Sequence, residues 1–146
     1  MRSIDIPQAD SLDQVRRVVV AVCAGARRSH AVRRATGISA RHVGYALHAA
    51  RLLGWLRVQE RALYATPSGE ALLQVSPGTA AEQALFERAV RGCGTVGLLA
   101  PQLLDEPPDP LALARHIADL SGIAFETARR RVQTLLAWRH RLLDGT

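Results

Sequence analysis

The sequence contains no lysine, and all 19 of its basic residues are arginine. Aromatic residues are also scarce, at 4% of the chain, and there are only two cysteines, Cys23 and Cys93. Few aromatics argue against a surface that binds RNA or single strands by base stacking. Two distant cysteines in apolar surroundings predict buried, reduced thiols in a cytoplasmic protein, not a disulfide framework.

The residue patterns that catalysis or metal binding requires are missing as well. Neither cysteine belongs to a CxxC pair, and no two of the five histidines have the i, i+4 spacing of a helical metal site. The only dense acids lie in the proline-rich stretch 105–110, where a solvated linker and a helix cap are expected. We therefore expect no enzymatic activity, no metal and no cofactor.

Long apolar runs are absent too. The longest, residues 18–26, is too short to cross a bilayer, and the polar start of the chain is unlike a signal peptide. No membrane partner is expected.

Positive charge is concentrated in one part of the chain. The formal net charge is +6, and no acidic residue lies between Asp13 and Glu60. That stretch holds the arginines Arg16, Arg17, Arg27, Arg28, Arg33, Arg34, Arg41, Arg51 and Arg57. Since ordinary surfaces mix both signs, the stretch predicts a polyanion partner, with codon bias in a GC-rich genome as the alternative. An acidic region, 77–110, precedes a second basic one, 111–146, which predicts two contact surfaces.

Capping and breaking residues divide the first half into short helices. Ser11 with Gln14 forms a capping box, and Ser29 and Ser39 are placed to cap the next two helices. Gly37 is expected to end the second helix, and the third should run to about residue 53. After it, residues 55–58 and 63–65 alternate around a polar turn, which predicts a β-hairpin.

Helices are predicted throughout the chain after the hairpin. Thr66-Pro67 and Asp109-Pro110 each pair a cap with proline at the first helical position, and Thr79 with Glu82 forms a capping box. The last helix should run from about Phe125 to Leu143. Leu113, Ile117 and Leu120 mark the buried face of the helix before it, and Ala128, Val132, Leu135 and Leu142 that of the last helix. Trp55 and Trp138 are expected to anchor the core.

Two similar turns indicate an internal duplication. Thr36-Gly37-Ile38 and Ser121-Gly122-Ile123 each join a shorter helix to a longer helix that bears arginine. Glycine suits such turns because it adopts left-handed backbone conformations without a steric penalty. This order of elements predicts two helix-turn-helix units, in which the second helix enters the major groove of DNA.

The outer face of residues 40–53 is the first candidate contact surface. With Val43, Leu47 and Ala50 facing inward, an open face is expected to carry side chains that reach phosphates or base edges: Arg41, Tyr45 and His48. The alternative is a solvated helix face with an incidental tyrosine.

Two segments resemble bacterial winged-helix domains. Ala50-Arg51-Leu52-Leu53-Gly54-Trp55-Leu56 is similar to their exit from the second helix, and Tyr64-Ala65-Thr66-Pro67-Ser68-Gly69-Glu70-Ala71-Leu72-Leu73 to the closure of their wing. The likeness covers residues 11–75. It implies DNA binding in which a hairpin, here with Arg57, Gln59 and Arg61, lies along the backbone or reaches a minor groove.

The segment Thr127 to Trp138 resembles the end of a tandem winged-helix module found in bacterial restriction and phage-defence proteins. Arg129, Arg130 and Arg131 stand in a row, and Arg130 and Gln133 lie opposite Ala128 and Val132. The last helix therefore offers a second candidate contact surface, Arg129, Arg130 and Gln133, with a structural or interface role as the alternative. Because residues 139–146 are too few for a second hairpin, the second unit is expected to lack a wing.

Together these patterns predict a mainly α-helical fold with a small β-hairpin, arranged as a tandem helix-turn-helix. The first unit, 11–76, is winged, and the second, 79–146, is wingless or truncated and packs on the first. We expect a cytoplasmic protein of bacterial type that binds double-stranded DNA, as a transcriptional regulator or in a defence or mobile-element system, alone, as a homodimer or in a larger complex. The expected DNA-binding residues are Arg41, Tyr45, His48, Arg51, Arg57, Arg61, Arg129, Arg130 and Gln133. The alternative is an interaction module or accessory subunit that docks an acidic partner protein.

Overall fold

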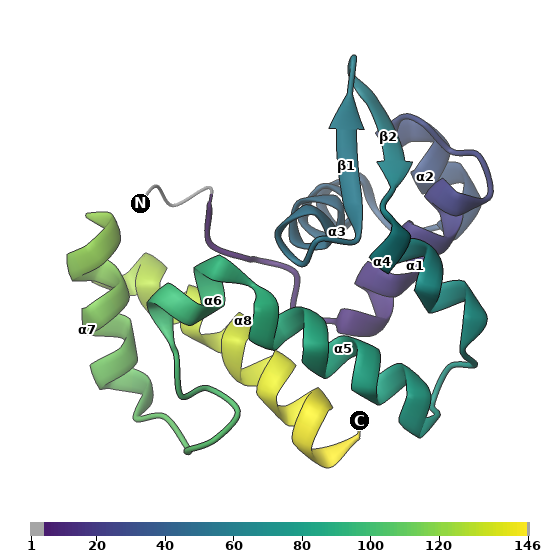
Figure 1. Ribbon diagram of the computed structural model, residues 1–146. Coiled ribbons are helices and arrows are strands. Elements are labelled where there is room, and N and C mark those ends of the chain that lie inside the picture. Colours follow the sequence, from purple (N-terminus) through teal and green to yellow (C-terminus); the bar gives the residue numbers. More distant parts are fainter. Residues whose placement is uncertain (1–4, 146) are drawn as a thin grey trace.

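A computed structural model describes residues 5–145 of the chain (Figure 1). Over these residues the fold is mainly helical with one small antiparallel hairpin, as the sequence predicts. The elements of the first half are α1 (Leu12–Cys23), α2 (Ser29–Thr36), α3 (Ala40–Leu52), β1 (Leu56–Gln59), β2 (Ala62–Ala65), α4 (Pro67–Ala71) and the 3-10 turn η2 (Leu72–Gln74). Those of the second half are α5 (Ala80–Gly92), α6 (Gly94–Leu99), α7 (Pro110–Ser121) and α8 (Phe125–Asp144).

Most of the predicted helix caps form. The Ser11 hydroxyl accepts the Gln14 N–H at 3.1 Å, and the hydroxyls of Ser39, Thr66 and Thr79 cap α3, α4 and α5 in the same way. The prediction for Ser29 was wrong. Arg28 is the N-cap of α2, and its side chain makes no capping hydrogen bond to the helix, because the backbone becomes helical at Ser29 itself.

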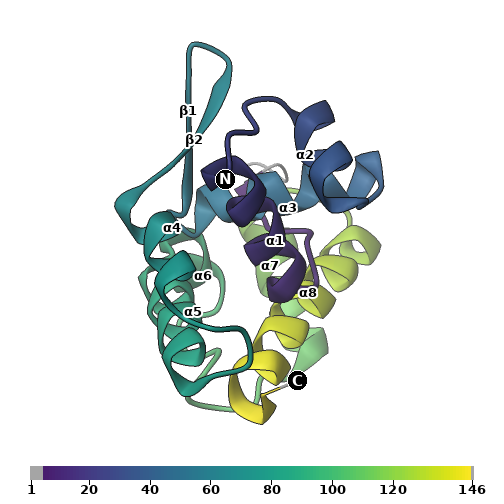
Figure 2. The ribbon, with the colours of Figure 1, turned by 90° about the vertical axis from the view of Figure 1, so that its right-hand side faces the viewer.

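The hairpin projects from the body of the molecule (Figures 1 and 2). Its strands pair with Arg57 opposite Tyr64, and the Leu63 N–H donates to the Arg27 carbonyl at 2.9 Å. The guanidinium groups of Arg27 and Arg57 lie 4.8 and 5.0 Å from the centre of the Tyr64 ring. These contacts fix the base of the hairpin against the segment between α1 and α2.

The two turns that match in sequence also match in geometry. In both 36–38 and 121–123, the hydroxyl of the first residue donates to the carbonyl four residues earlier and accepts the N–H two residues later. Gly37 and Gly122 have φ angles of 72° and 76°. The resemblance between the turns therefore extends from three residue types to the backbone path and its hydrogen bonds.

The second half packs as predicted along α8 but not along all of α7. Ala128, Val132, Leu135 and Leu142 are buried, together with Trp138. The prediction that Leu120 faces the core was wrong, since its side chain is 40% exposed. Ala114 and Ile117 are the buried residues of α7, and its last turn extends past the core.

Both halves contribute to one hydrophobic core. Trp55 is 2% exposed and packs against Phe86 of α5, with ring centroids 5.5 Å apart. The segment before α1 joins the halves a second time, because the Ala9 carbonyl accepts the Trp138 Nε1–H at 2.7 Å. The predicted units 11–76 and 79–146 are therefore held against each other by apolar and polar contacts.

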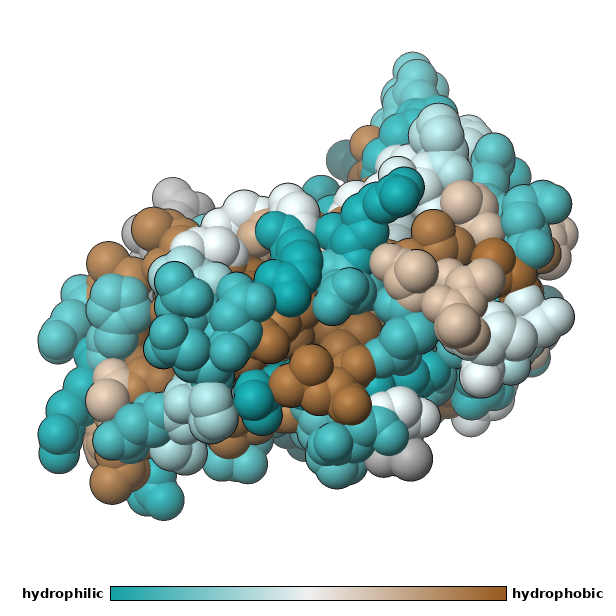
Figure 3. Space-filling model, turned by 60° about the horizontal axis from the view of Figure 1, so that its bottom comes forward, coloured by the Kyte–Doolittle hydropathy of each residue, from teal (hydrophilic) through white to brown (hydrophobic). Residues whose placement is uncertain are grey.

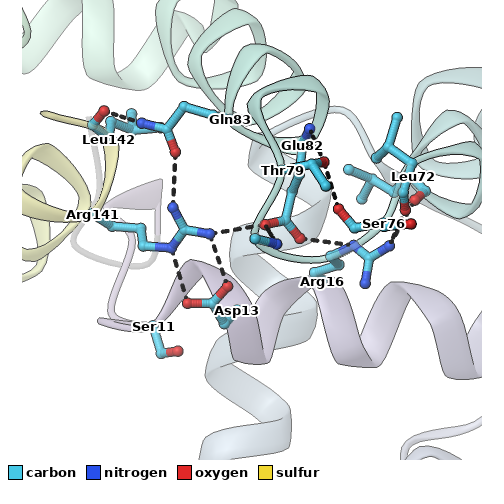
Figure 4. A network of polar contacts seen from close by, with 12 residues as sticks. Ser11, Asp13, Arg16, Leu72, Ser76, Thr79, Glu82, Gln83, Arg141 and Leu142 are labelled. Atoms are coloured by element: carbon cyan, nitrogen blue, oxygen red, sulfur yellow. Dashed lines mark hydrogen bonds and ion pairs between the residues drawn. The ribbon is translucent and has the colours of Figure 1, made fainter. Parts of the chain in front are cut away.

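A polar network also crosses this joint (Figure 4). The Glu82 carboxylate of α5 is 1% exposed and lies between Arg16 of α1 and Arg141 of α8, at 3.2 and 2.9 Å. Arg141 binds both carboxylate oxygens of Asp13, at 3.0 and 3.2 Å. The Gly78 N–H donates to Glu82 at 3.0 Å, so one carboxylate connects three parts of the chain.

The surface mixes polar and apolar side chains. Figure 3 shows hydrophobic residues gathered near the centre of one face and hydrophilic residues around them.

Both cysteines are free. The prediction that both are buried was wrong for Cys23, which is only half-buried. Burial, and then the Glu70 charge, raise the pKa of the Cys23 thiol. Within residues 5–145, every helix is either too short or too polar to span a bilayer.

Candidate nucleic-acid interface

The outer face of α3 is only partly open. Arg41 is exposed, and its Nε donates to the Tyr45 hydroxyl at 2.9 Å while its guanidinium lies 5.5 Å from the centre of the Tyr45 ring. Tyr45 and His48 are half-buried, and Tyr45 packs against the core. The prediction of an open face therefore holds for Arg41 and was wrong for the other two, which are only partly exposed; Tyr45 borders a hollow that α8 also lines.

The remaining predicted arginines of the first half lie at the surface. Arg51 is exposed in the last turn of α3, and Arg57 is exposed on β1, where it contacts Gln59. Arg61 lies at the tip of the hairpin. Glu60 and Arg61 have φ angles of 52° and 66°, a left-handed geometry that glycine adopts more easily than residues with a Cβ atom. The tip of the hairpin therefore holds two charged residues, Glu60 and Arg61, at positions where the backbone geometry favours glycine.

Four arginines of the acid-free stretch have structural partners instead. Arg16 and Arg27 each donate to two backbone carbonyls, and Arg17 and Arg28 donate to those of Thr36 and Arg61. For Arg17, Arg27 and Arg28, carbonyl oxygens take the place of the carboxylates that this part of the sequence lacks, and Arg16 also pairs with Glu82. Part of the local arginine excess thus stabilises the fold, and the count of charges alone overstates the free positive surface.

Sequence reasoning missed one pair of exposed arginines. The side chains of Arg33 and Arg34, in the last turn of α2, make no hydrogen bond or ion pair with any residue between 5 and 145. Together with His30, Gly37, Ile38 and Ser39 they line a hollow of about 470 Å³ that no carboxylate borders. Their adjacency just before a predicted turn was the signal that could have found them.

The arginine cluster of α8 divides into three environments. Arg129 forms a surface ion pair with Glu126 at 3.2 Å, an exposed pair of the kind that contributes little energy. Arg131 is half-buried; burial, and then the adjacent Arg130 charge, lower its pKa. Arg130 and Gln133 are exposed. Of the three arginines, Arg130 is the one whose charge is both exposed and unpaired among the described residues.

The structure brings two of the predicted surfaces together. A hollow of about 440 Å³ lies between α3, α8 and the segment before α1. Its lining combines Arg41 and Tyr45 with Arg130 and Gln133, and is completed by Gln8, Asp10, Ser11, Gln14, His42 and Thr134. The two surfaces predicted from the charge pattern are therefore not separate, because α3 and α8 contribute to a single polar hollow.

Nothing in the described residues suggests a metal centre, since no three His, Cys, Asp or Glu side chains are placed to hold an ion. No protein-family profile, curated protein or solved structure matches this chain. The likeness to winged-helix proteins thus remains a prediction from sequence.

Proposed function

We propose that the protein binds double-stranded DNA, with α2, the turn at Gly37, α3 and the hairpin acting as a winged helix-turn-helix unit. The observation that carries this proposal is the uncompensated charge of that surface. Arg33, Arg34, Arg51 and Arg61 are exposed and have no ion pair among the described residues. A guanidinium group binds phosphate oxygens through paired, charge-assisted hydrogen bonds, so such a surface suits a phosphate backbone.

The arrangement of the elements supports the same proposal. A short helix, a left-handed glycine and a second helix capped by Ser39 are the parts of a helix-turn-helix, and the projecting hairpin lies directly after them in the chain. In this proposal α3 enters the major groove, while Arg57 and Arg61 contact the backbone beside it. The biological use that we propose is transcriptional control or DNA engagement in a defence or mobile-element system.

Binding to a labelled 24-bp duplex of mixed sequence tests the proposal. If six to ten phosphates are contacted, affinity should fall by about 10³–10⁵ between 50 and 200 mM salt, because bound counterions are released. The double variant Arg33→Ala/Arg34→Ala should weaken binding, whereas Arg115→Ala, which removes an exposed arginine of α7, should have little effect. If the parent protein ignores the duplex at 50 mM salt but binds an acidic polypeptide, it is an interaction module instead.

The hairpin tip offers a separate test. Replacing Glu60-Arg61 with Asn-Gly should raise the free energy of unfolding by about 1–2 kcal/mol, because these residues accept left-handed backbone angles without the usual cost. The change removes one charge of each sign, so the net charge stays the same. Weaker duplex binding by the more stable variant, measured by anisotropy beside urea unfolding, supports a contact made by Arg61. Unchanged affinity would remove the tip from the interface.

A further inference from the structure

We infer that the hollow between α3 and α8 receives one phosphate of the duplex backbone, so that α8 acts on the same stretch of DNA as α3. The inference rests on the proposed function and adds the role of the second half of the chain. In this arrangement α3 is the helix that contacts bases, and α8 is a clamp, meaning a helix that holds the phosphate backbone and does not enter a groove. The residues that carry it are Arg41 of α3 and Arg130 of α8.

The lining of the hollow suits a single anion. Arg41 and Arg130 contribute two positive charges and Asp10 one negative charge, which leaves a formal charge of +1 with His42 neutral. The Asp10 carboxylate already accepts the Thr134 hydroxyl at 2.6 Å. Gln14 and Gln133 add amide donors. Arg131, beside Arg130, has a buried Nε without a hydrogen-bond partner, so positive charge near the hollow is only partly compensated.

The size of the hollow decides between a clamp and a second reading helix. Helices that read successive major grooves lie about 34 Å apart along the duplex. Side chains of α3 and α8 instead line one and the same hollow of about 440 Å³, so the two helices meet at one place and are not separated by the spacing between grooves. Although their turns are alike, the two helices are too close to occupy successive grooves. We therefore expect a short site without two-fold symmetry.

Two single variants test the clamp in opposite directions. Arg130→Ala should weaken duplex binding about eightfold at 0.1 M salt and reduce the salt slope by about 0.9, the contribution of one phosphate contact. Asp10→Asn keeps an acceptor for Thr134 and removes the negative charge, so it should tighten binding. Asp119→Asn removes an exposed carboxylate of α7, which does not line the hollow, and should tighten binding less. A gain of affinity cannot result from misfolding.

A double-mutant cycle shows whether both arginines serve one phosphate. The combined Arg41→Ala/Arg130→Ala variant should deviate about twofold or more from the product of the single effects, as expected for groups with a shared partner. The matched pair Arg61→Ala/Arg130→Ala should multiply without such a deviation. If the parent binds duplex but Arg130→Ala and Asp10→Asn change nothing, the clamp is overturned and the proposed function stands. If the parent does not bind duplex at all, both are overturned.

Discussion

Replacing Glu82 with alanine should lower the free energy of unfolding by about 3–5 kcal/mol, the usual cost of removing one partner from a buried ion pair. The carboxylate lies between Arg16 and Arg141, whose side chains are only 13% and 10% exposed. Without it, two guanidinium groups remain close together in a poorly hydrated place. Asp13, which is 58% exposed, cannot compensate both charges from its position beside Arg141.

Urea unfolding followed by tryptophan fluorescence measures this effect, and Trp55 and Trp138 provide one probe in each half of the chain. Glu87→Ala is the matched control on the same helix. Its carboxylate is 48% exposed and pairs with Arg91, which also has Asp105 as a partner, so the unfolding midpoint should hardly change. Equal effects of the two substitutions would contradict a structural role of the buried network.

Replacing Gly69 with alanine should cost about 3 kcal/mol or more, because overpacking against rigid backbone exceeds any gain in helix propensity. A Cβ atom at this position would lie 2.0 Å from the Trp55 carbonyl oxygen and 3.0 Å from its carbon. That carbonyl also accepts the Thr66 N–H at 3.1 Å. To make room, α4 would have to move away from the base of the hairpin.

Gly44→Ala is the control for this second prediction. A methyl group there meets no atom within 4 Å, and Gly44 lies inside α3, so the same substitution should stabilise the protein by about 0.5–1 kcal/mol. Thermal unfolding of both variants tests the opposite signs. A stable Gly69→Ala protein with an intact hairpin would show that the contact between α4 and Trp55 is looser than the distances indicate.

The sequence was a good guide to local structure, because caps and left-handed glycines act within a few residues. Ser11, Ser39 and Asp109 cap helices as predicted, and Gly122 ends α7. At Ser29 the predicted N-cap is off by one residue. The actual N-cap, Arg28, cannot be recognised from the sequence, because its side chain does not cap the helix. Leu120 fits the periodicity of a buried face, but its exposure depends on how far the neighbouring helices extend.

The candidate site was less predictable because it depends on contacts between distant parts of the chain. Helical periodicity places Tyr45 opposite the buried residues of α3, yet it cannot show that Tyr45 borders a hollow that α8 also lines. Nor can it show that Arg130 comes to the same hollow as Arg41 from almost ninety positions away in the sequence. Charge counting likewise did not separate Arg16, which binds Glu82, from Arg34, which has no such partner.

The packing of Trp55 on Phe86 limits how the molecule adapts to what it binds. Tandem modules joined by a flexible tether can swivel and follow a ligand that curves. Here the linker between η2 and α5 is short, and the contact between the Trp55 and Phe86 rings joins the two halves. Neither half can therefore rotate against the other without breaking that contact. The protein should therefore meet its partner with a preset shape, and any bending must be done by the partner.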